Sequence, residues 1–224
     1  LRQDKSSGRE PLTARLATDL IRTSGFHNVI STELHAEQIV GFYKATKIDN
    51  LPSSRFLISY YKQIHPDLNG NLVVMAPDAG GAKRAEFYAR KLNARAAQAF
   101  KIRDNSAANV VEELKVAGLV RGYDVLIVDD MIDTGGSIAK LVEKLREKGV
   151  NNISVCCTHP LLNKDAGEKL KDLGVTVIGT DTITKTPEFK QENPWYKEVS
   201  LAPLFAQAIY NMNYDKSFSE LYYE

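Results

Sequence analysis

Short apolar runs separated by amphipathic segments set the pattern of this 224-residue chain. The runs at residues 72–76, 125–128 and 153–157 are predominantly apolar, which is typical of strands buried on both faces. Weaker strand patterns lie at residues 28–34, 96–100 and 175–180. Amphipathic or capped segments predict helices at residues 10–24, 53–64, 82–92, 138–148, 165–173 and 201–212. Strands that alternate with helices imply an α/β fold with a mostly parallel sheet flanked by helices.

The segment that follows the run at 125–128 carries the strongest candidate chemistry. Asp129 and Asp130 come at the end of that predicted strand, and an amphipathic helix begins shortly afterwards. Glycines let the backbone approach an anion closely, and N–H groups at a helix start hold phosphate, which predicts a cradle at Asp133, Thr134, Gly135, Gly136 and Ser137. The two preceding acids would repel a phosphate, so we expect them to face sugar hydroxyls or a magnesium-bound group. The alternative is that Asp133 and Ser137 are only turn and cap residues.

Two further polar clusters follow predicted strands. In residues 77–81, two glycines can form a backbone nest for an anion, and Asp78 can accept a hydrogen bond from water on a magnesium ion. The alternative is an ordinary turn with Asp78 as its cap. In residues 33–38, His35 is either a structural residue or a ligand, and magnesium's preference for oxygen weakens a direct metal role. Because carboxyl ends of parallel strands meet at one edge, we expect all three clusters to face one crevice.

Composition and charge exclude several classes of protein. The hydrophobic content of 43% allows a proper core, and a net charge of +1 with well-mixed signs gives no basic surface for nucleic acid. We expect no membrane contact, because no run has transmembrane length and no signal-peptide pattern is present. Cys156 and Cys157 are adjacent in an apolar run, which predicts buried thiols in a reducing compartment and hence the cytoplasm. A first residue other than methionine, Leu1, favours a fragment of a longer protein. P-loop and zinc-ligand spacings are absent from the sequence.

The chain resembles the phosphoribosyl-pyrophosphate (PRPP) synthetases, or ribose-phosphate diphosphokinases. Residues 124–137 are similar to the signature that this family shares with phosphoribosyltransferases for a ribose 5-phosphate group. The resemblance to PRPP synthetases in particular lies in three other motifs in the expected order. These are Arg2-Gln3-Asp4-Lys5, the Leu-His-Ala-Glu-Gln segment that begins at Leu34, and Pro-Asp-Ala-Gly-Gly-Ala-Lys-Arg from Pro77.

This resemblance implies an activity, its substrates and its cofactor. The β,γ-diphosphoryl group of ATP would be transferred to the 1-hydroxyl of ribose 5-phosphate with Mg²⁺, giving PRPP and AMP. Asp133 to Ser137 would hold the 5-phosphate, while Asp129 and Asp130 would bind the ribose hydroxyls. His35 and Asp78 would lie at the magnesium–ATP site, and Arg2 and Gln3 would contact the nucleotide.

The resemblance assigns the catalytic role to a polar segment. Residues 101–108 lack periodicity, which predicts a loop, and Lys101 and Arg103 match the family's catalytic loop. These two side chains would close over the β-phosphorus and neutralise charge on the transferring group, and Arg103 would also contact ribose 5-phosphate. An ordinary solvated loop is the alternative.

The family's architecture implies two type I phosphoribosyltransferase-like lobes with mostly parallel sheets, the first of them incomplete here. We expect a remnant of the first lobe in residues 1–50, the second lobe in residues 51–200, and a closing helix and tail in residues 201–224 that packs on the first lobe. Family sites lie between subunits, so a homo-oligomer is implied, a hexamer by resemblance. Lys44 stands where relatives often carry an acid, which argues against a second magnesium site. The alternatives are a salvage phosphoribosyltransferase and a non-catalytic PRPP-synthetase-associated subunit.

Overall fold

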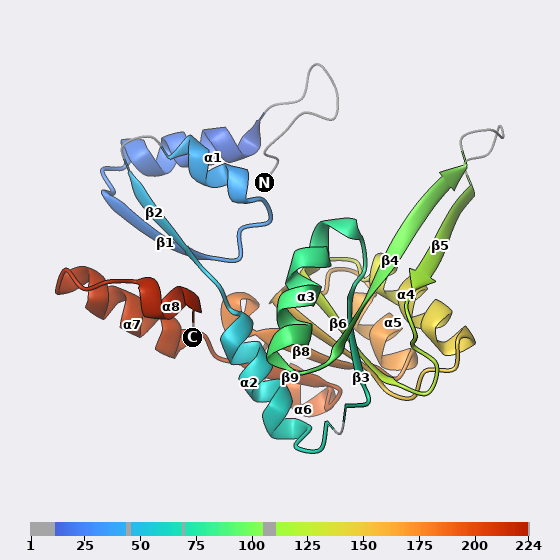
Figure 1. Ribbon diagram of the computed structural model, residues 1–224. Helices are drawn as coiled ribbons and strands as arrows, with labels where there is room; N and C mark the ends of the chain where they lie inside the picture. The colour runs from blue at the N-terminus through green and yellow to red at the C-terminus, as the bar shows by residue number, and fades with distance from the viewer. Residues whose placement is uncertain (1–11, 44–45, 69, 105–110, 224) are drawn as a thin grey trace. The chain divides into compact units, whose positions relative to one another are not determined.

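The chain forms two compact units, Leu1–Ser53 with Ala202–Glu224, and Ser54–Leu201 (Figure 1). The computed structural model describes residues 12–43, 46–68, 70–104 and 111–223, with the side chains of 101–104, 111–113 and 223 excepted. None of the helices in these residues combines the length and apolarity needed to cross a bilayer.

A twisted sheet forms the centre of the Ser54–Leu201 unit. Within the described residues it has seven strands in the order β5-β4-β3-β6-β7-β8-β9, and every neighbouring pair is parallel except β4 with β5. The predicted mostly parallel α/β sheet is therefore confirmed. The strands are β3 (Leu72–Ala76), β4 (Arg95–Asp104), β5 (Val111–Ala117), β6 (Asp124–Ile132), β7 (Ile153–Pro160), β8 (Thr176–Thr180) and β9 (Tyr196–Val199).

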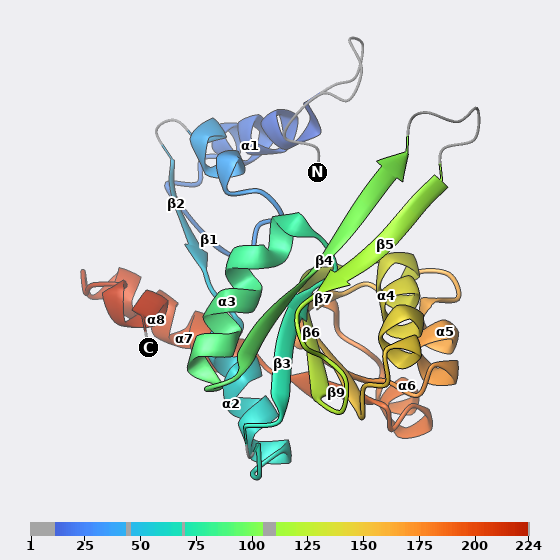
Figure 2. The ribbon, with the colours of Figure 1, turned by 45° about the vertical axis from the view of Figure 1, so that its right-hand side comes forward.

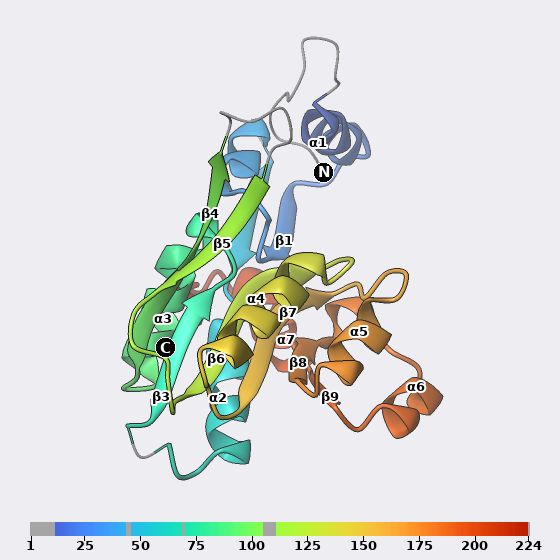
Figure 3. The same ribbon diagram turned by 90° about the vertical axis from the view of Figure 1, so that its right-hand side faces the viewer.

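Helices cover both faces of this sheet, as Figures 2 and 3 show. Helices α2 (Ser54–Ile64) and α3 (Ala82–Lys91) share one apolar core with Leu126 and Val128 of β6. The helix α4 (Gly136–Glu147) packs on the other core together with Val125 and Ile127. Alternate residues of β6 therefore enter opposite cores, which explains why its sequence is a continuous apolar run. On the α4 side lie also α5 (Ala166–Asp172) and α6 (Pro187–Glu192).

The strand order places a topological switch point between β3 and β6. From β3 the chain crosses through α3 to β4 on one side, while β6 pairs with β3 on the other. Ligands of open α/β sheets bind in the crevice outside the carboxyl ends of the strands at such a point. Both Asp78 and Asp129 lie there, because β3 ends at Ala76 and its register with β6 runs only to Ile127.

The other unit contains a short parallel pair of strands, β1 (Asn28–Thr32) and β2 (Lys47–Leu51). The predicted strand at 28–34 ends two residues early, because Glu33 adopts a left-handed conformation with φ of 44°. A small apolar cluster of Ala14, Ala36 and Ile39 also lies in this unit, with Leu34 and Phe42 packed against it. The remaining elements are α1 (Thr13–Thr23), the 3₁₀ helix η1 (Glu37–Phe42), α7 (Ala202–Asn213) and α8 (Ser219–Tyr223).

The predicted loop at residues 101–108 is wrong for its first half. Strand β4 continues to Asp104 and pairs with β5 in an antiparallel register that runs from Gln98 opposite Ala117 to Asp104 opposite Val111. Residues 105–108 lie outside the described residues. Backbone hydrogen bonds hold a strand pair whether or not its side chains are apolar, so a search for apolar periodicity overlooked this one.

Candidate functional site

The loop between β6 and α4 has the geometry of an anion cradle. Gly135 adopts a left-handed conformation with φ of 70°, and it is the N-cap of α4 without contributing a side-chain acceptor. A Cβ atom added at Gly136 would meet no atom within 4 Å, so the first turn of the helix is open on that side. The helix dipole and the N–H groups of a first turn favour a bound anion. Ser137 is exposed in this turn and Thr134 is half-buried.

The loop after β7 supports this cradle. Asn163 donates a hydrogen bond from Nδ2 to Asp133 Oδ1 at 2.7 Å, and its backbone N–H donates to the Asp133 carbonyl at 2.9 Å. A Cβ atom at Gly135 would lie 3.4 Å from Ala166 Cβ, so the start of α5 packs closely against the loop. Sequence reasoning missed Asn163. Its place just past the carboxyl end of β7 becomes informative only once β7 is known to pair with β6.

Two adjacent carboxylates lie at the carboxyl end of β6. Arg84, from the first turn of α3, places its Nη1 3.5 Å from Asp129 Oδ1 and 3.9 Å from Asp130 Oδ1. Burial, together with the neighbouring Asp130 carboxyl, raises the pKa of Asp129 to about 7, while the Arg84 guanidinium opposes the rise. The pair therefore offers hydrogen-bond acceptors whose charge is partly balanced from within the protein.

The turn after β3 differs from the expectation. Asp78 Oδ1 accepts hydrogen bonds from the N–H groups of Gly80 at 2.9 Å and Gly81 at 3.3 Å. The expected backbone nest thus holds an anion, but this anion is the chain's own carboxylate. Asp78 does serve as the cap of this turn, and a metal role for its other oxygen stays a prediction. A Cβ atom at Gly81 would lie 2.6 Å from Ala76 Cβ, so the turn requires glycine there.

The other predicted site residues lie in the other unit or have side chains outside the described part of the chain. His35 is exposed and belongs to the other unit, beyond β1. Lys101 and Arg103 have their backbone in β4, with side chains outside the described part. Arg2 and Gln3 lie outside the described residues altogether. Among the residues that the structure describes, no group of three or more His, Cys, Asp or Glu side chains is arranged to hold a metal ion.

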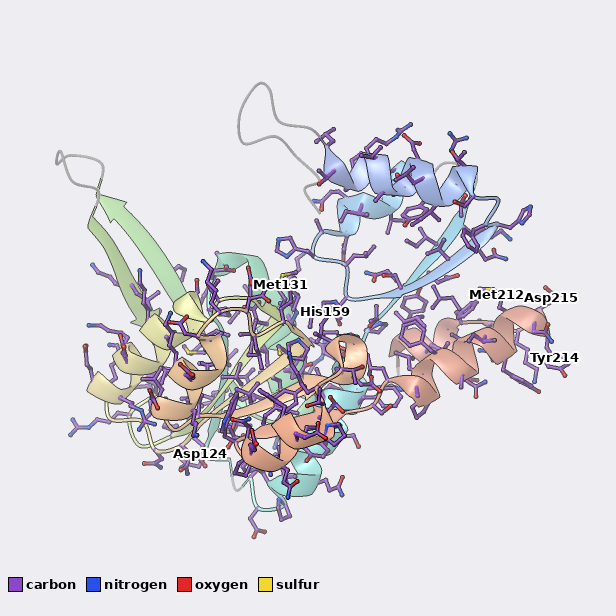
Figure 4. All side chains as sticks on the ribbon, turned by 180° about the vertical axis from the view of Figure 1, so that it is seen from behind. Asp124, Met131, His159, Met212, Tyr214 and Asp215 are labelled. Carbon is purple, nitrogen blue, oxygen red and sulfur yellow. The ribbon has the colours of Figure 1, made fainter. Side chains whose placement is uncertain are left out.

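Two further side chains, Met131 and His159, lie at the carboxyl edge of the sheet. Figure 4 shows Met131 of β6 and His159 of β7 at this edge, with Asp124 at the opposite end of β6, and Met131 and His159 are register partners.

Cys156 and Cys157 lie within β7, and both are free and buried, as predicted. Burial raises the pKa of each thiol well above its usual value.

Comparison with known proteins identifies the family. The family model of the phosphoribosyl transferase domain matches residues 48–197. A ribose-phosphate pyrophosphokinase of Caldanaerobacter subterraneus subsp. tengcongensis is 39% identical over 223 residues, covering 99% of this chain and 68% of that protein. The chain belongs to the ribose-phosphate pyrophosphokinase family. Another ribose-phosphate pyrophosphokinase, from Corynebacterium efficiens, is 40% identical over 213 residues, or 93% of this chain and 63% of that protein.

A solved structure agrees with this assignment. The crystal structure of phosphoribosylpyrophosphate synthetase from Mycobacterium smegmatis matches with a TM-score of 0.84 and 33% identity, over 95% of this chain and 67% of that one. The fold is therefore that of a ribose-phosphate pyrophosphokinase, as the sequence motifs implied. The chain spans about two thirds of the length of the ribose-phosphate pyrophosphokinases that it matches.

Proposed function

We propose that this protein transfers the β,γ-diphosphoryl group of ATP to the 1-hydroxyl of ribose 5-phosphate, giving PRPP and AMP. The observation that carries the proposal is the open first turn of α4 beside two carboxylates at one sheet edge, in a chain of the ribose-phosphate pyrophosphokinase family. The names of the relatives do not favour a salvage phosphoribosyltransferase or a non-catalytic subunit.

The sugar phosphate is proposed to lie along the edge of β6. Residues 133–137 would hold the 5-phosphate, and Asp129 and Asp130 would accept hydrogen bonds from the ribose hydroxyls. Arg84 supports this arrangement, because its positive charge offsets part of the repulsion between two acids and a nearby phosphate. The ring would then be fixed at both ends, with its 1-hydroxyl directed away from the cradle.

The transfer step moves a highly charged diphosphoryl group and develops negative charge on the oxygen that leaves with AMP. The 1-hydroxyl oxygen forms a bond to the β-phosphorus of ATP and its proton is released to solvent, while the bond from that phosphorus to the α,β-bridging oxygen breaks and AMP leaves with that oxygen. We assign Lys101 and Arg103 to neutralising the charge that moves during this step, with Arg103 also contacting ribose 5-phosphate. Arg2 and Gln3 are assigned to the nucleotide.

Magnesium is the proposed cofactor, held with ATP by Asp78 and His35. The described residues contain no all-protein cage for a cation, which fits an ion that usually keeps several waters and binds through one or two carboxylates and substrate phosphates. When bound, Mg²⁺ would neutralise phosphate charge and orient the β-phosphorus. Asp78 fits this task because its exposed carboxylate uses only Oδ1 in the two hydrogen bonds to the turn.

We further propose a cytoplasmic homo-oligomer, a hexamer by family resemblance, with buried thiols that suit a reducing compartment. Light scattering of the purified protein measures the oligomer directly. A monomer at micromolar concentration would contradict this part of the proposal.

The activity is tested by incubating the protein with ATP, ribose 5-phosphate and Mg²⁺ and scoring AMP and PRPP. We expect AMP and PRPP in equal amounts, and no AMP when ribose 5-phosphate is omitted. Absence of AMP with consumption of added PRPP in the presence of a nucleobase would overturn the proposal in favour of a phosphoribosyltransferase.

A further inference from the structure

Asn163, in the loop after β7, makes two hydrogen bonds to Asp133 of the cradle. It contacts Asp133 twice, through its side-chain amide to Oδ1 at 2.7 Å and through its backbone N–H to the carbonyl oxygen at 2.9 Å. The adjacent Leu162 N–H donates to the carbonyl of Ile132 at 2.9 Å. The loop after β7 therefore continues the pairing of β6 with β7 beyond the strands and ends at the cradle.

The loop holds Asn163 in place at a conformational cost. Leu162 and Lys164, on either side of it, adopt left-handed backbone conformations with φ of 53° and 57°. Such conformations are unfavourable for residues other than glycine, and they persist when the surrounding contacts fix them. Lys185 provides one such contact, since its Nζ donates to the Leu161 carbonyl at 3.0 Å. Two strained residues that flank an asparagine point to a task for that side chain.

The task follows from the exposure of Asp133. A carboxylate in solvent samples several rotamers, and its negative charge disfavours a phosphate bound to the same loop. The amide of Asn163 fixes Oδ1, so the direction of the second oxygen is also set. The same N–H group offsets part of the carboxylate's charge.

We infer that Asn163 is a positioning residue for ribose 5-phosphate, which acts by holding Asp133 at the cradle. The inference rests on the proposed function, because it assigns ribose 5-phosphate to residues 133–137. It adds a residue from the β7–α5 loop to the sugar-phosphate site. Asn163 need not touch the substrate.

The same two strands offer a matched control. At the other end of β6, Asn152 donates from Nδ2 to Asp124 Oδ1 at 2.9 Å and from its backbone N–H to the same oxygen at 3.0 Å. This pair repeats the asparagine–aspartate contact at the amino end of β6. Figure 4 shows Asp124 there, far from the carboxyl edge. Asn163→Ala and Asn152→Ala therefore remove the same kind of bond at opposite ends of the sheet.

Calorimetric titration of the full protein with ribose 5-phosphate and, separately, with Mg-ATP tests the inference. We expect Asn163→Ala to weaken ribose 5-phosphate binding roughly tenfold, because a hydrogen bond to a charged group is lost, and to leave ATP binding unchanged. Asn163→Asp should weaken it further, since an isosteric carboxylate would repel Asp133. Asn152→Ala should lower the Tm about as much as Asn163→Ala and leave ribose 5-phosphate binding within about twofold.

The outcomes separate the two hypotheses. Wild-type affinity for ribose 5-phosphate in both Asn163 variants would overturn the positioning role while leaving the proposed function intact. An equal loss of ATP and ribose 5-phosphate binding would also overturn it, because that pattern indicates a general structural effect. If the wild-type protein itself fails to bind ribose 5-phosphate, the proposed function falls, and the inference falls with it.

Discussion

Gly135 and Gly136 are adjacent, yet they serve the cradle in different ways. Gly135 needs its left-handed backbone, and a Cβ atom there would also approach Ala166, whereas Gly136 faces open space. Gly136→Val should therefore fold normally and weaken ribose 5-phosphate binding about tenfold or more, by blocking approach to the helix start. Gly135→Ala should instead cost stability, on the order of 1–2 kcal/mol.

Thermal unfolding together with calorimetric titration separates these two effects. Unchanged ribose 5-phosphate affinity in a folded Gly136→Val variant would show that the loop is only a turn. A loss of Tm in Gly136→Val as large as that in Gly135→Ala would make its binding defect uninformative about phosphate.

The buried Asp129 predicts a pH dependence of stability. Its pKa of about 7 in the folded protein lies above the ordinary value of 3.8, so folding favours the protonated form. The stability that Asp129 contributes is present below about pH 4 and is lost as the pH rises through about 7. Asp129→Asn keeps the neutral form at every pH. Its stability relative to wild type should therefore increase between about pH 5 and pH 8, on the order of 2 kcal/mol.

Denaturant titrations across this pH range measure the difference. Asp172→Asn, at the exposed end of α5, is the control for removing one carboxylate from the protein. An advantage of Asp129→Asn that stays flat or shrinks as the pH rises would contradict the pKa assigned to Asp129.

At the scale of elements, apolar periodicity predicted the centre of the fold well. The buried strand β3 and the helices α3 and α4 follow the predicted ranges to within two residues, because strands and helices that enter a core must carry apolar residues at their own period. Strands β6 and β7 begin within one residue of the predicted starts but continue four and three residues past the predicted ends, so that Asp129 and Asp130 lie within β6. Strand β9 was missed because its two central residues are lysine and glutamate at a sheet edge. Helix α6 was also missed, although its sequence carries a helix-start signal. The Thr186 side chain caps the helix, and Pro187 follows in its first turn.

The candidate site was less predictable than these elements. Asp129, Asp130 and residues 133–137 were singled out as candidates because they are contiguous with a recognisable strand. Arg84 lay inside a recognised motif, yet its contact with both acids depends on the pairing of β3 with β6. Asn163 gave no local signal, because its partner is 30 positions earlier in the chain. Contacts between loops of neighbouring strands require the sheet order, which periodicity does not provide.

The β4–β5 hairpin carries a prediction of its own. Lys101→Ala should lower kcat by about a hundredfold or more with little change in the KM for ribose 5-phosphate, since its charge is assigned to the transition state. Lys115 of β5 is the matched control, because it pairs with Phe100 next to Lys101 in the register. Lys115→Ala removes the same charge from the same hairpin and should leave kcat within about threefold. Steady-state kinetics would contradict the role if Lys101→Ala changed only KM.

In the whole molecule, the residues proposed to bind the two substrates belong to both units. The residues assigned to ribose 5-phosphate belong to Ser54–Leu201, whereas His35, assigned to magnesium–ATP, belongs to the other unit. His35→Ala should therefore weaken Mg-ATP binding, on the order of tenfold, and leave ribose 5-phosphate binding unchanged. His27→Ala, an exposed histidine in the same unit, is the control. Unaltered Mg-ATP affinity in His35→Ala would remove this histidine from the site.

In the proposed site the start of α4 holds the 5-phosphate while Asp129 and Asp130 bind the sugar. A crystal of the protein soaked with ribose 5-phosphate would show this arrangement. We expect phosphate density against the backbone of residues 133–137, with the ribose hydroxyls within hydrogen-bond distance of Asp129 or Asp130. Ribose 5-phosphate bound elsewhere, or a cradle that stays empty at saturating concentration, would contradict it.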